Sequence, residues 1–297
     1  MNWKKNEITT ELGERVNAQA PIIVSASRST DIPAFYSEWF FDRLKKGCLK
    51  WKNPFNGVPL YVSFANIRLI VFWSKNPNPI IKHLNYLDEK NINYYFQFSL
   101  NDYYNEKLEA KVPNIDYRIE TFIKLSEKIG KEKIIWRFDP YILTDTTGVD
   151  ELLKRTEYIG DKLKKQLNKK WNLEVGTCAE KIDLDKYDII HNKCIDDDLM
   201  IKLFSNDKLL MDFLGYKPAS AQLNLFAAEP IAAYKIKNLK DKGQRELCGC
   251  IFSKDIGQYN TCPHECVYCY ANTSKEVVSR NYNAHKANPN NETIIGE

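Results

Sequence analysis

The sequence predicts an α/β fold built on a parallel sheet, in the form of a TIM-like (β/α) barrel. Two observations predict it. Apolar runs rich in β-branched and aromatic residues alternate along the chain with amphipathic runs of helical period. The apolar runs are also nearly continuous, as expected for strands that are covered on both faces of a parallel sheet.

The elements follow one another as strand and helix along most of the chain. Asp31 is a plausible cap for the first helix, and a polar loop at residues 52–57 leads into the second strand. We expect strands at residues 22–27, 60–64, 69–73, 94–99, 133–138 and 173–177, and helices at residues 33–46, 79–90, 117–129, 149–167 and 271–286. Residues 1–247 would form the barrel body, and the cysteine-rich residues 248–297 would complete it.

Composition limits the class of protein. The 297 residues, of which 43% are hydrophobic, suffice for one large domain, and no run of about 18 apolar residues predicts a transmembrane helix. The first residues lack the apolar core of a signal peptide, so we expect a reducing cytoplasm, where eight cysteines favour metal binding over disulfides. A net charge of +4 permits an anionic substrate without indicating nucleic-acid binding.

Polar side chains follow each expected strand. In a (β/α) barrel these strand ends meet at one rim, where active sites are built. Some of them could instead cap helices or form turns, and Arg137 could be satisfied by Asp139 alone. The polar residues at the strand ends are Ser25, Ser27, Arg28, Thr30 and Asp31; Ser74, Lys75 and Asn76; Gln97, Ser99, Asn101 and Asp102; Arg137 and Asp139; and Thr177, Cys178 and Glu180.

Three cysteines near the C-terminus form the most informative motif. Cys262, Cys266 and Cys269 have the spacing C-x3-C-x2-C within one loop. Closely spaced thiolates of this kind ligate iron–sulfur clusters, and three of them would leave one iron of a 4Fe–4S cube open. A zinc knuckle is the alternative, although zinc sites usually pair C-x2-C units to supply four ligands. Tyr268 and Tyr270 could shield the cluster from water.

The remaining cysteines allow a second metal site. Cys48 stands alone and is treated as a bystander. Cys178, Cys194, Cys248 and Cys250 make a full ligand set for a second iron–sulfur cluster or a tetrahedral ion, with His191 as a possible substitute for one thiolate. Alternatively, some of the four are small buried hydrophobic residues, or one of the last two closes the first cluster.

The combined motifs resemble the bacterial DUF1848 family over nearly the whole chain. That resemblance implies a C-terminal cysteine cluster similar to that of radical S-adenosylmethionine (SAM) proteins, and no established reaction. The tail at residues 262–270 is also similar to the cluster loop of spore photoproduct lyase, a DNA repair enzyme. The motifs lie at residues 25–36, 72–77, 136–140, 177–180, 194–197 and 248–270.

The position of the cluster motif departs from the radical SAM pattern. Radical SAM enzymes usually carry this motif after their first strand, whereas here it lies near the end of the chain. A circularly permuted barrel would explain this, with residues 250–286 as the first βα unit and residues 25–31 on the neighbouring strand. The Gly-Gly-Glu motif of those enzymes is lacking. Relatives also have a strand–helix unit near residues 167–173, so the barrel could be open there or a segment could be missing.

Two hypotheses follow from the resemblance. In the first, a radical SAM-type enzyme holds a 4Fe–4S cluster and SAM, generates a 5′-deoxyadenosyl radical, and takes electrons from a ferredoxin or flavodoxin. Its substrate would be a small, possibly anionic molecule; nucleic acid is not favoured, and no membrane is expected. Candidates for SAM binding are Ser25, Ser27, Thr30, Gln97 and Tyr268, and candidates for catalysis or substrate binding are Arg28, Asp31, Lys75, Arg137, Asp139 and Glu180. In the second hypothesis, a closed iron–sulfur or zinc site serves electron transfer, sensing or metal handling.

Overall fold

The computed structural model describes residues 3–54, 56–166, 175–179, 181, 183–218, 220–224, 227–231, 234–235 and 237–296. The chain divides into two units. The main unit consists of Asn2–Asn172 together with Lys254–Glu297, and the inserted unit spans Leu173–Ser253. The main unit therefore joins the N-terminal half of the chain to the C-terminal cysteine motif.

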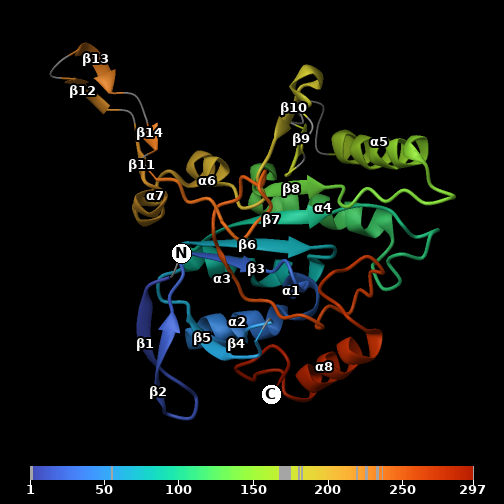
Figure 1. The fold of residues 1–297 in the computed structure, drawn as a ribbon, viewed down its shortest axis with the longest axis horizontal. Coiled ribbons are helices and arrows are strands. Elements are labelled where there is room, and N and C mark those ends of the chain that lie inside the picture. The colour runs from blue at the N-terminus through green and yellow to red at the C-terminus, as the bar shows by residue number, and fades with distance from the viewer. Residues whose placement is uncertain are drawn as a thin grey trace. The chain divides into compact units, whose positions relative to one another are not determined.

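A five-stranded parallel sheet forms the centre of the main unit. Its order is β15–β3–β6–β7–β8, and every neighbouring pair is parallel. Figure 1 shows β3, β6, β7 and β8 side by side. The predicted α/β class with a parallel sheet is confirmed. The strands are β3 (Ile23–Ala26), β6 (Leu69–Ser74), β7 (Asn93–Ser99), β8 (Ile134–Arg137) and β15 (Lys254–Asp255).

Strand β15 is an edge strand that pairs with β3, although the two lie far apart in sequence. Lys254 pairs with Val24, and Asp255 pairs with Ser25. The strand that leads into the cysteine loop thus neighbours the strand that ends in the segment at residues 25–31. At the other edge of this sheet, among the described residues, lies β8.

The predicted helices are present, with shifted ends. The first predicted helix breaks at Tyr36 into two, and the last begins only at Lys275 because the Ser274 side chain accepts from the amide of Val277. Asp31 caps the first of them, as predicted, by accepting from the amide of Ala34. The helices are α1 (Ile32–Phe35), α2 (Ser37–Lys46), α3 (Leu84–Glu89), α4 (Ile115–Ile129), α5 (Val149–Gln166) and α8 (Lys275–Ala287), with 3-10 turns η1 (Asn78–His83) and η2 (Lys131–Lys133).

A second sheet of the main unit was largely missed by the sequence prediction. Its order is β1–β2–β5–β4, and it is antiparallel except where β2 meets β5. The strand expected at residues 60–64 belongs to this sheet. The short strands that flank it carry Lys, Arg and Asn, which masked their β character. The strands are β1 (Lys5–Thr9), β2 (Arg15–Gln19), β4 (Cys48–Lys52) and β5 (Pro59–Ser63).

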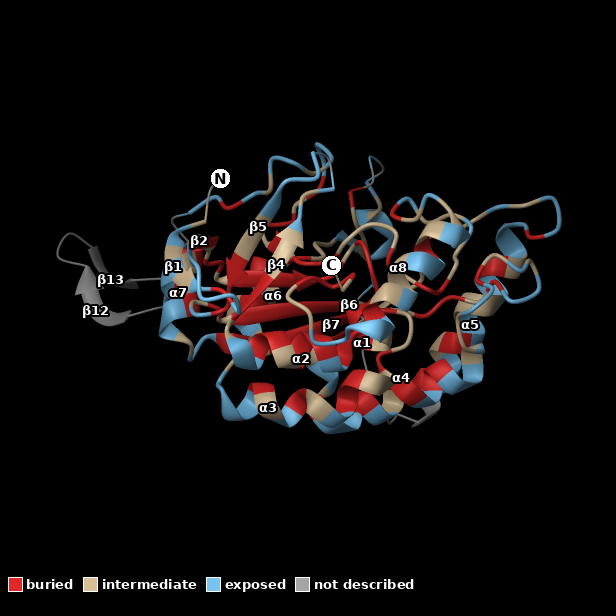
Figure 2. Ribbon diagram, turned by 90° about the horizontal axis from the view of Figure 1, so that it is seen from below, coloured by how far each residue is buried: buried red, intermediate tan, exposed pale blue. Residues whose placement is uncertain are grey.

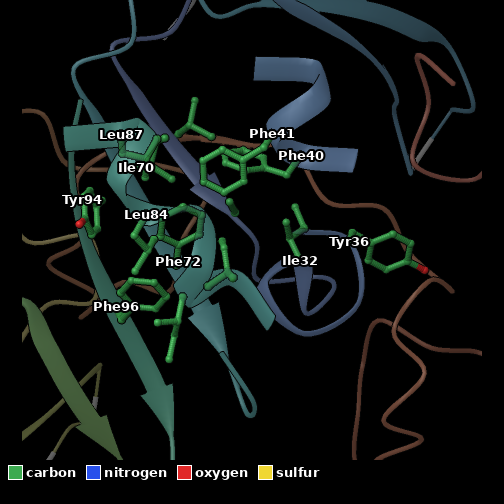
Figure 3. Close-up of a cluster of buried hydrophobic side chains, with 14 of the residues drawn as sticks. Ile32, Tyr36, Phe40, Phe41, Ile70, Phe72, Leu84, Leu87, Tyr94 and Phe96 are labelled. Carbon is green, nitrogen blue, oxygen red and sulfur yellow. The ribbon is translucent and has the colours of Figure 1, made fainter. Parts of the chain in front are cut away.

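Aromatic and aliphatic side chains fill the space between the parallel sheet and helices α1–α3. The ring of Phe72 on β6 lies 4.9 Å from that of Phe96 and 5.6 Å from that of Phe40 (Figure 3). Figure 2 shows β6 and β7 almost wholly buried and α2, α3 and α4 buried mainly along one side. Burial of this cluster holds the sheet in place and so fixes the ends of its strands.

The inserted unit has small sheets of its own. The strand expected at residues 173–177 is β9 (Val175–Thr177), which pairs in parallel with β10 (Ile189–His191) and not with the five-stranded sheet. Two further pairs are β11 (Tyr216–Lys217) with β14 (Tyr234–Lys235) and β12 (Ser220–Asn224) with β13 (Ala227–Ile231). The unit also contains η3 (Asp185–Tyr187), α6 (Asp197–Phe204) and α7 (Lys208–Leu214). Residues 167–174, where a strand–helix unit was expected to be missing, lie outside the described residues.

A search of the described helices found none with the length and apolarity that crossing a membrane requires.

Lys254 gives the parallel sheet a pH-dependent weakness. Its ammonium lies 3.1 Å from the centre of the Trp51 ring, and burial lowers the pKa of Lys254 to about 8. Because the unfolded chain keeps the ordinary pKa, it binds more protons than the folded chain between pH 8 and about 10.5, so this group makes stability rise with pH there.

We expect Lys254→Met to raise the free energy of unfolding at pH 7 by about 1 to 2 kcal/mol, since removing the buried charge outweighs the lost cation–π contact. Urea denaturation at pH 7 and pH 10 measures this, and the gain should shrink at the higher pH. The exposed Lys52→Met is the control. A gain that is equal at both pH values would contradict the assignment.

Candidate metal centre

The cysteine loop lies against the segment at residues 108–111 of the main unit. The amide of Val267 donates to the carbonyl of Leu108 (2.9 Å), and the amide of Lys111 donates to that of His264 (3.1 Å). Cys266 forms an isolated antiparallel bridge with Glu109. These backbone contacts present Cys262, Cys266 and Cys269 within one ordered loop between β15 and α8.

Burial is the main cause of the raised pKa values of Cys262 and Cys266. Burial raises the pKa of the Cys262 thiol, as does the nearby Asp31 carboxylate, against the opposing effect of the backbone amides of His264 and Asp31. Burial also raises the pKa of Cys266 to about 12, and Lys75 opposes that rise. Both thiols would therefore lose protons on binding a metal, and the local amides and cation would stabilise the resulting thiolates.

Asp31 ties the loop to two strand ends. Its Oδ2 accepts from the backbone amide of Lys75 (2.8 Å) and lies 2.8 Å from His264 Nε2. His264 Nδ1 lies 3.3 Å from the Lys111 carbonyl, so both ring nitrogens face oxygen acceptors. Asp31 and His264 are both buried. The predicted site residue Asp31 thus orients the loop from β3, in addition to capping α1.

Lys75 belongs to a second buried network beside Cys266. Its ammonium donates to Glu109 Oε1 (2.7 Å) and Asn101 Oδ1 (3.1 Å), and the Tyr268 hydroxyl also donates to Glu109. Burial alone would raise the pKa of Glu109, but Lys75 and Arg118 outweigh it and leave that pKa below its usual value. Glu109 is therefore a buried carboxylate with cationic partners, which the sequence analysis missed because it follows no strand.

Asp255 at the end of β15 is the other residue that the sequence analysis missed. Its carboxylate accepts from the hydroxyls of Ser25 (3.2 Å) and Ser27 (2.7 Å) and from the amides of Arg28 (2.8 Å) and Gly257 (2.9 Å). One side chain thereby fastens the carboxyl end of β3 to the start of the cysteine loop. Its place after a two-residue strand gave no periodic signal.

Several buried polar atoms at the carboxyl ends of β3 and β6 have no partner among the described residues. They are Arg28 Nη2, Thr30 Oγ1, Trp73 Nε1 and Asn76 Oδ1. Leaving such atoms unpaired costs free energy, and native proteins usually satisfy them with protein, water or a ligand. The Arg28 guanidinium lies 5.5 Å from the Trp73 ring. These atoms therefore have hydrogen-bonding capacity that the described residues leave unused.

The remaining residues that the sequence predicted for the site are Arg137, Asp139, Gln97 and Glu180. Arg137 lies 5.1 Å from the Trp73 ring and forms a 2.7 Å ion pair with the exposed Asp139. Gln97 is buried on β7. Glu180 lies outside the described residues.

The second predicted set of cysteines comes together in the inserted unit. The sulfurs of Cys178, Cys248 and Cys250 lie within 4.8 Å of one another, and Cys194 Sγ lies 3.5 Å from Cys178 Sγ. Cys48 is buried on β4 of the main unit.

The sequence matches the model of one protein family. The model matches residues 23–169 and 164–271, which together cover most of the chain. The chain belongs to the DUF1848 family. That family is described as a domain of unknown function. No curated protein and no solved structure matches the chain.

Gly257 leaves no room for a side chain beside the DUF1848 motif residue Ser27. A Cβ there would lie 1.9 Å from Ser27 Oγ and 2.6 Å from Ser27 Cβ, so a methyl group would push Ser27 away from Asp255. We expect Gly257→Ala to lower the free energy of unfolding by about 2 kcal/mol or more, as overpacking does. Gly148→Ala, where no atom lies within 4 Å, should change it by less than about 0.5 kcal/mol. Equal midpoints of thermal unfolding for the two variants would contradict this description.

Proposed function

We propose that this DUF1848 protein is a radical SAM-type enzyme with an open 4Fe–4S cluster on Cys262, Cys266 and Cys269. One observation carries the proposal. The three-cysteine loop follows an edge strand, β15, and its parallel neighbour β3 is followed by buried polar atoms that have no partner within the described part of the chain. A cluster site and a polar ligand site would thus lie at one edge of one sheet.

The predicted permuted barrel is part of the same proposal. We infer a partial, circularly permuted (β/α) barrel in which β15 and α8 take the first position and β3 the second. The parallel order β15–β3–β6–β7–β8 supports this inference. In such a sheet the active site lies outside the carboxyl ends of the strands, where Asp31, Lys75 and Asp255 are found.

The residues around the three-cysteine loop suit an iron–sulfur cluster. Three thiols of one loop suit iron–sulfur ligation, while Lys75 and backbone amides would balance the charge of the thiolates. Cys248 and Cys250 gather with Cys178 instead, which supports an iron without a fourth cysteine. When bound, the reduced cluster would supply the electron that cleaves SAM to a 5′-deoxyadenosyl radical.

The chain's own residues would bind and orient the ligands. Arg28 Nη2 and Thr30 Oγ1 have unused hydrogen-bonding capacity for polar groups of SAM, while Ser25 and Ser27 hold Asp255 and so position the Arg28 backbone. Arg137 next to Trp73 would favour a small anionic substrate. A ferredoxin or flavodoxin would reduce the cluster in a reducing compartment.

We expect anaerobic reconstitution with iron and sulfide to give a cluster EPR signal that shifts on adding SAM, with 5′-deoxyadenosine formed under reduction. Cys266→Ala should abolish the signal of this cluster and its SAM response, because a ligand to one iron is lost. Cys48→Ala is the matched control, since Cys48 is buried apart from the loop.

A cluster signal that is indifferent to SAM, or zinc bound by these cysteines in place of iron, would overturn the enzyme proposal. Either result would favour a closed site for electron transfer, sensing or metal handling.

We expect Arg28→Gln to weaken SAM binding about 10- to 100-fold, the worth of a charge-assisted hydrogen bond, without changing the iron content. SAM titration followed by EPR measures it. Arg15→Gln is the control, since the Arg15 side chain is 79% exposed and lies 3.7 Å from Glu7. Undiminished SAM affinity in the first variant would exclude Arg28 from the site.

A further inference from the structure

We propose that the inserted unit binds a single tetrahedral Zn²⁺ ion through the thiolates of Cys178, Cys194, Cys248 and Cys250. This site is separate from the proposed cluster and needs neither SAM nor iron. Its four ligands come from three segments: the turn after β9, the turn after β10, and the Cys248–Cys250 pair.

The spacing of the sulfurs fits one ion. A tetrahedral centre with Zn–S bonds of about 2.3 Å places its four sulfurs about 3.8 Å apart. Cys194 Sγ and Cys178 Sγ lie 3.5 Å apart, and the sulfurs of Cys178, Cys248 and Cys250 lie within 4.8 Å of one another. The 3.5 Å separation and the 4.8 Å upper limit are both compatible with the expected spacing.

The same spacing disfavours an iron–sulfur cluster in this unit. In a 4Fe–4S cube each cysteine binds a different iron, so the cysteine sulfurs surround the whole cube and lie farther apart than around one ion. In a 2Fe–2S cluster, any three ligands include two on different irons. Three sulfurs gathered within 4.8 Å match neither arrangement.

Backbone amides already point at one of the sulfurs. The amides of Cys194 and Ile195 donate to Cys250 Sγ at 3.2 and 3.4 Å. Amide donors of this kind stabilise a metal-bound thiolate and orient it. Cys250 is 2% exposed and Cys248 is 4% exposed, whereas Cys178 and Cys194 are half-buried, so one side of the site is shielded from water.

The residues around the cysteines fit a ligand-holding role. A Cβ at Gly249 would lie 2.8 Å from Lys193 Cγ, so the residue between Cys248 and Cys250 must be small. His191 Nε2 lies 2.9 Å from the Leu247 carbonyl, so this nitrogen bonds to the backbone before Cys248. If His191 replaced one of the thiolates, it would do so through Nδ1, while Nε2 stays on the backbone.

The neighbouring acidic group is a weaker candidate for a cation. The carboxylates of Asp196, Asp197 and Asp198 also approach one another, but the Lys193 ammonium lies among them, 2.5 Å from Asp197 and 3.3 Å from Asp196. That ammonium already occupies the place of a cation.

An ion at this place would stabilise a unit with little apolar core. Its buried hydrophobic residues among those described are few, and they include two of the four cysteines. Small folds of this kind commonly depend on a structural metal. The ion would join the β9–β10 pair to the segment that carries Cys248 and Cys250.

The test uses Co²⁺ as a spectroscopic probe in the full chain. Metal-free Cys262→Ala/Cys266→Ala/Cys269→Ala protein should bind one equivalent of Co²⁺, with the thiolate charge-transfer and d–d bands of a tetrahedral thiolate site, and Zn²⁺ should displace it. Cys250→Ser added to this background should lose the bands, and Cys48→Ser added to it should keep them. Retention of the bands in the Cys250 variant would overturn the proposal, as would octahedral Co²⁺ bands.

X-ray absorption of the wild-type protein does not depend on any variant folding. We expect a zinc edge with four sulfur neighbours at about 2.3 Å. Chelation should increase amide exchange in residues 175–195 and 239–251. Nitrogen or oxygen in place of two or more sulfurs, or a second cluster of iron and sulfide with no zinc, would overturn the assignment.

Discussion

The parallel pairing of β15 with β3 is the constraint on which the proposed active site depends. It joins residues more than two hundred positions apart through only two paired positions, and Asp255 reinforces it by accepting four hydrogen bonds from residues 25–28 and 257. Together with the contact between Asp31 and His264 and the backbone contacts to residues 108–111, this pairing fixes the cysteine loop relative to Asp31 and Lys75. The close approach of Gly257 to Ser27 is the steric counterpart of the same junction.

Much of the main unit could be predicted from local patterns. Continuous apolar runs predicted the strands β3, β6, β7 and β8, and Asp31 before Pro33 predicted a capped helix. These signals are local because each depends on periodicity or on a capping side chain. The antiparallel sheet was missed because its strands are short and polar on one face, and β9 was assigned to the barrel because a short apolar run does not reveal its partner.

The candidate site could be predicted only where a strand end or a cysteine motif marked it. Asp31 and Lys75 follow buried strands, and the three-cysteine motif has its own spacing. Glu109 and Asp255 were missed since they gain their roles through contacts with distant residues: Lys75 and Arg118 in one case, Ser25 and Ser27 in the other. Long-range contacts of this kind leave no trace in local periodicity.

The two cysteine groups differ in the number of cysteines that they offer and in the hydrogen bonds that surround them. This difference is the reason why we propose a different role for each group. In the inserted unit, three sulfurs gather within 4.8 Å of one another, a fourth lies 3.5 Å from one of them, and backbone amides donate to Cys250, which suits a closed structural ion. In the main unit, one loop supplies three cysteines, and buried atoms of Arg28 and Trp73 on the neighbouring strand ends lack partners among the described residues. A metal ion with four protein ligands stabilises a fold. A centre that binds a further ligand needs a metal with an open coordination position and nearby polar atoms whose hydrogen bonds are not yet made.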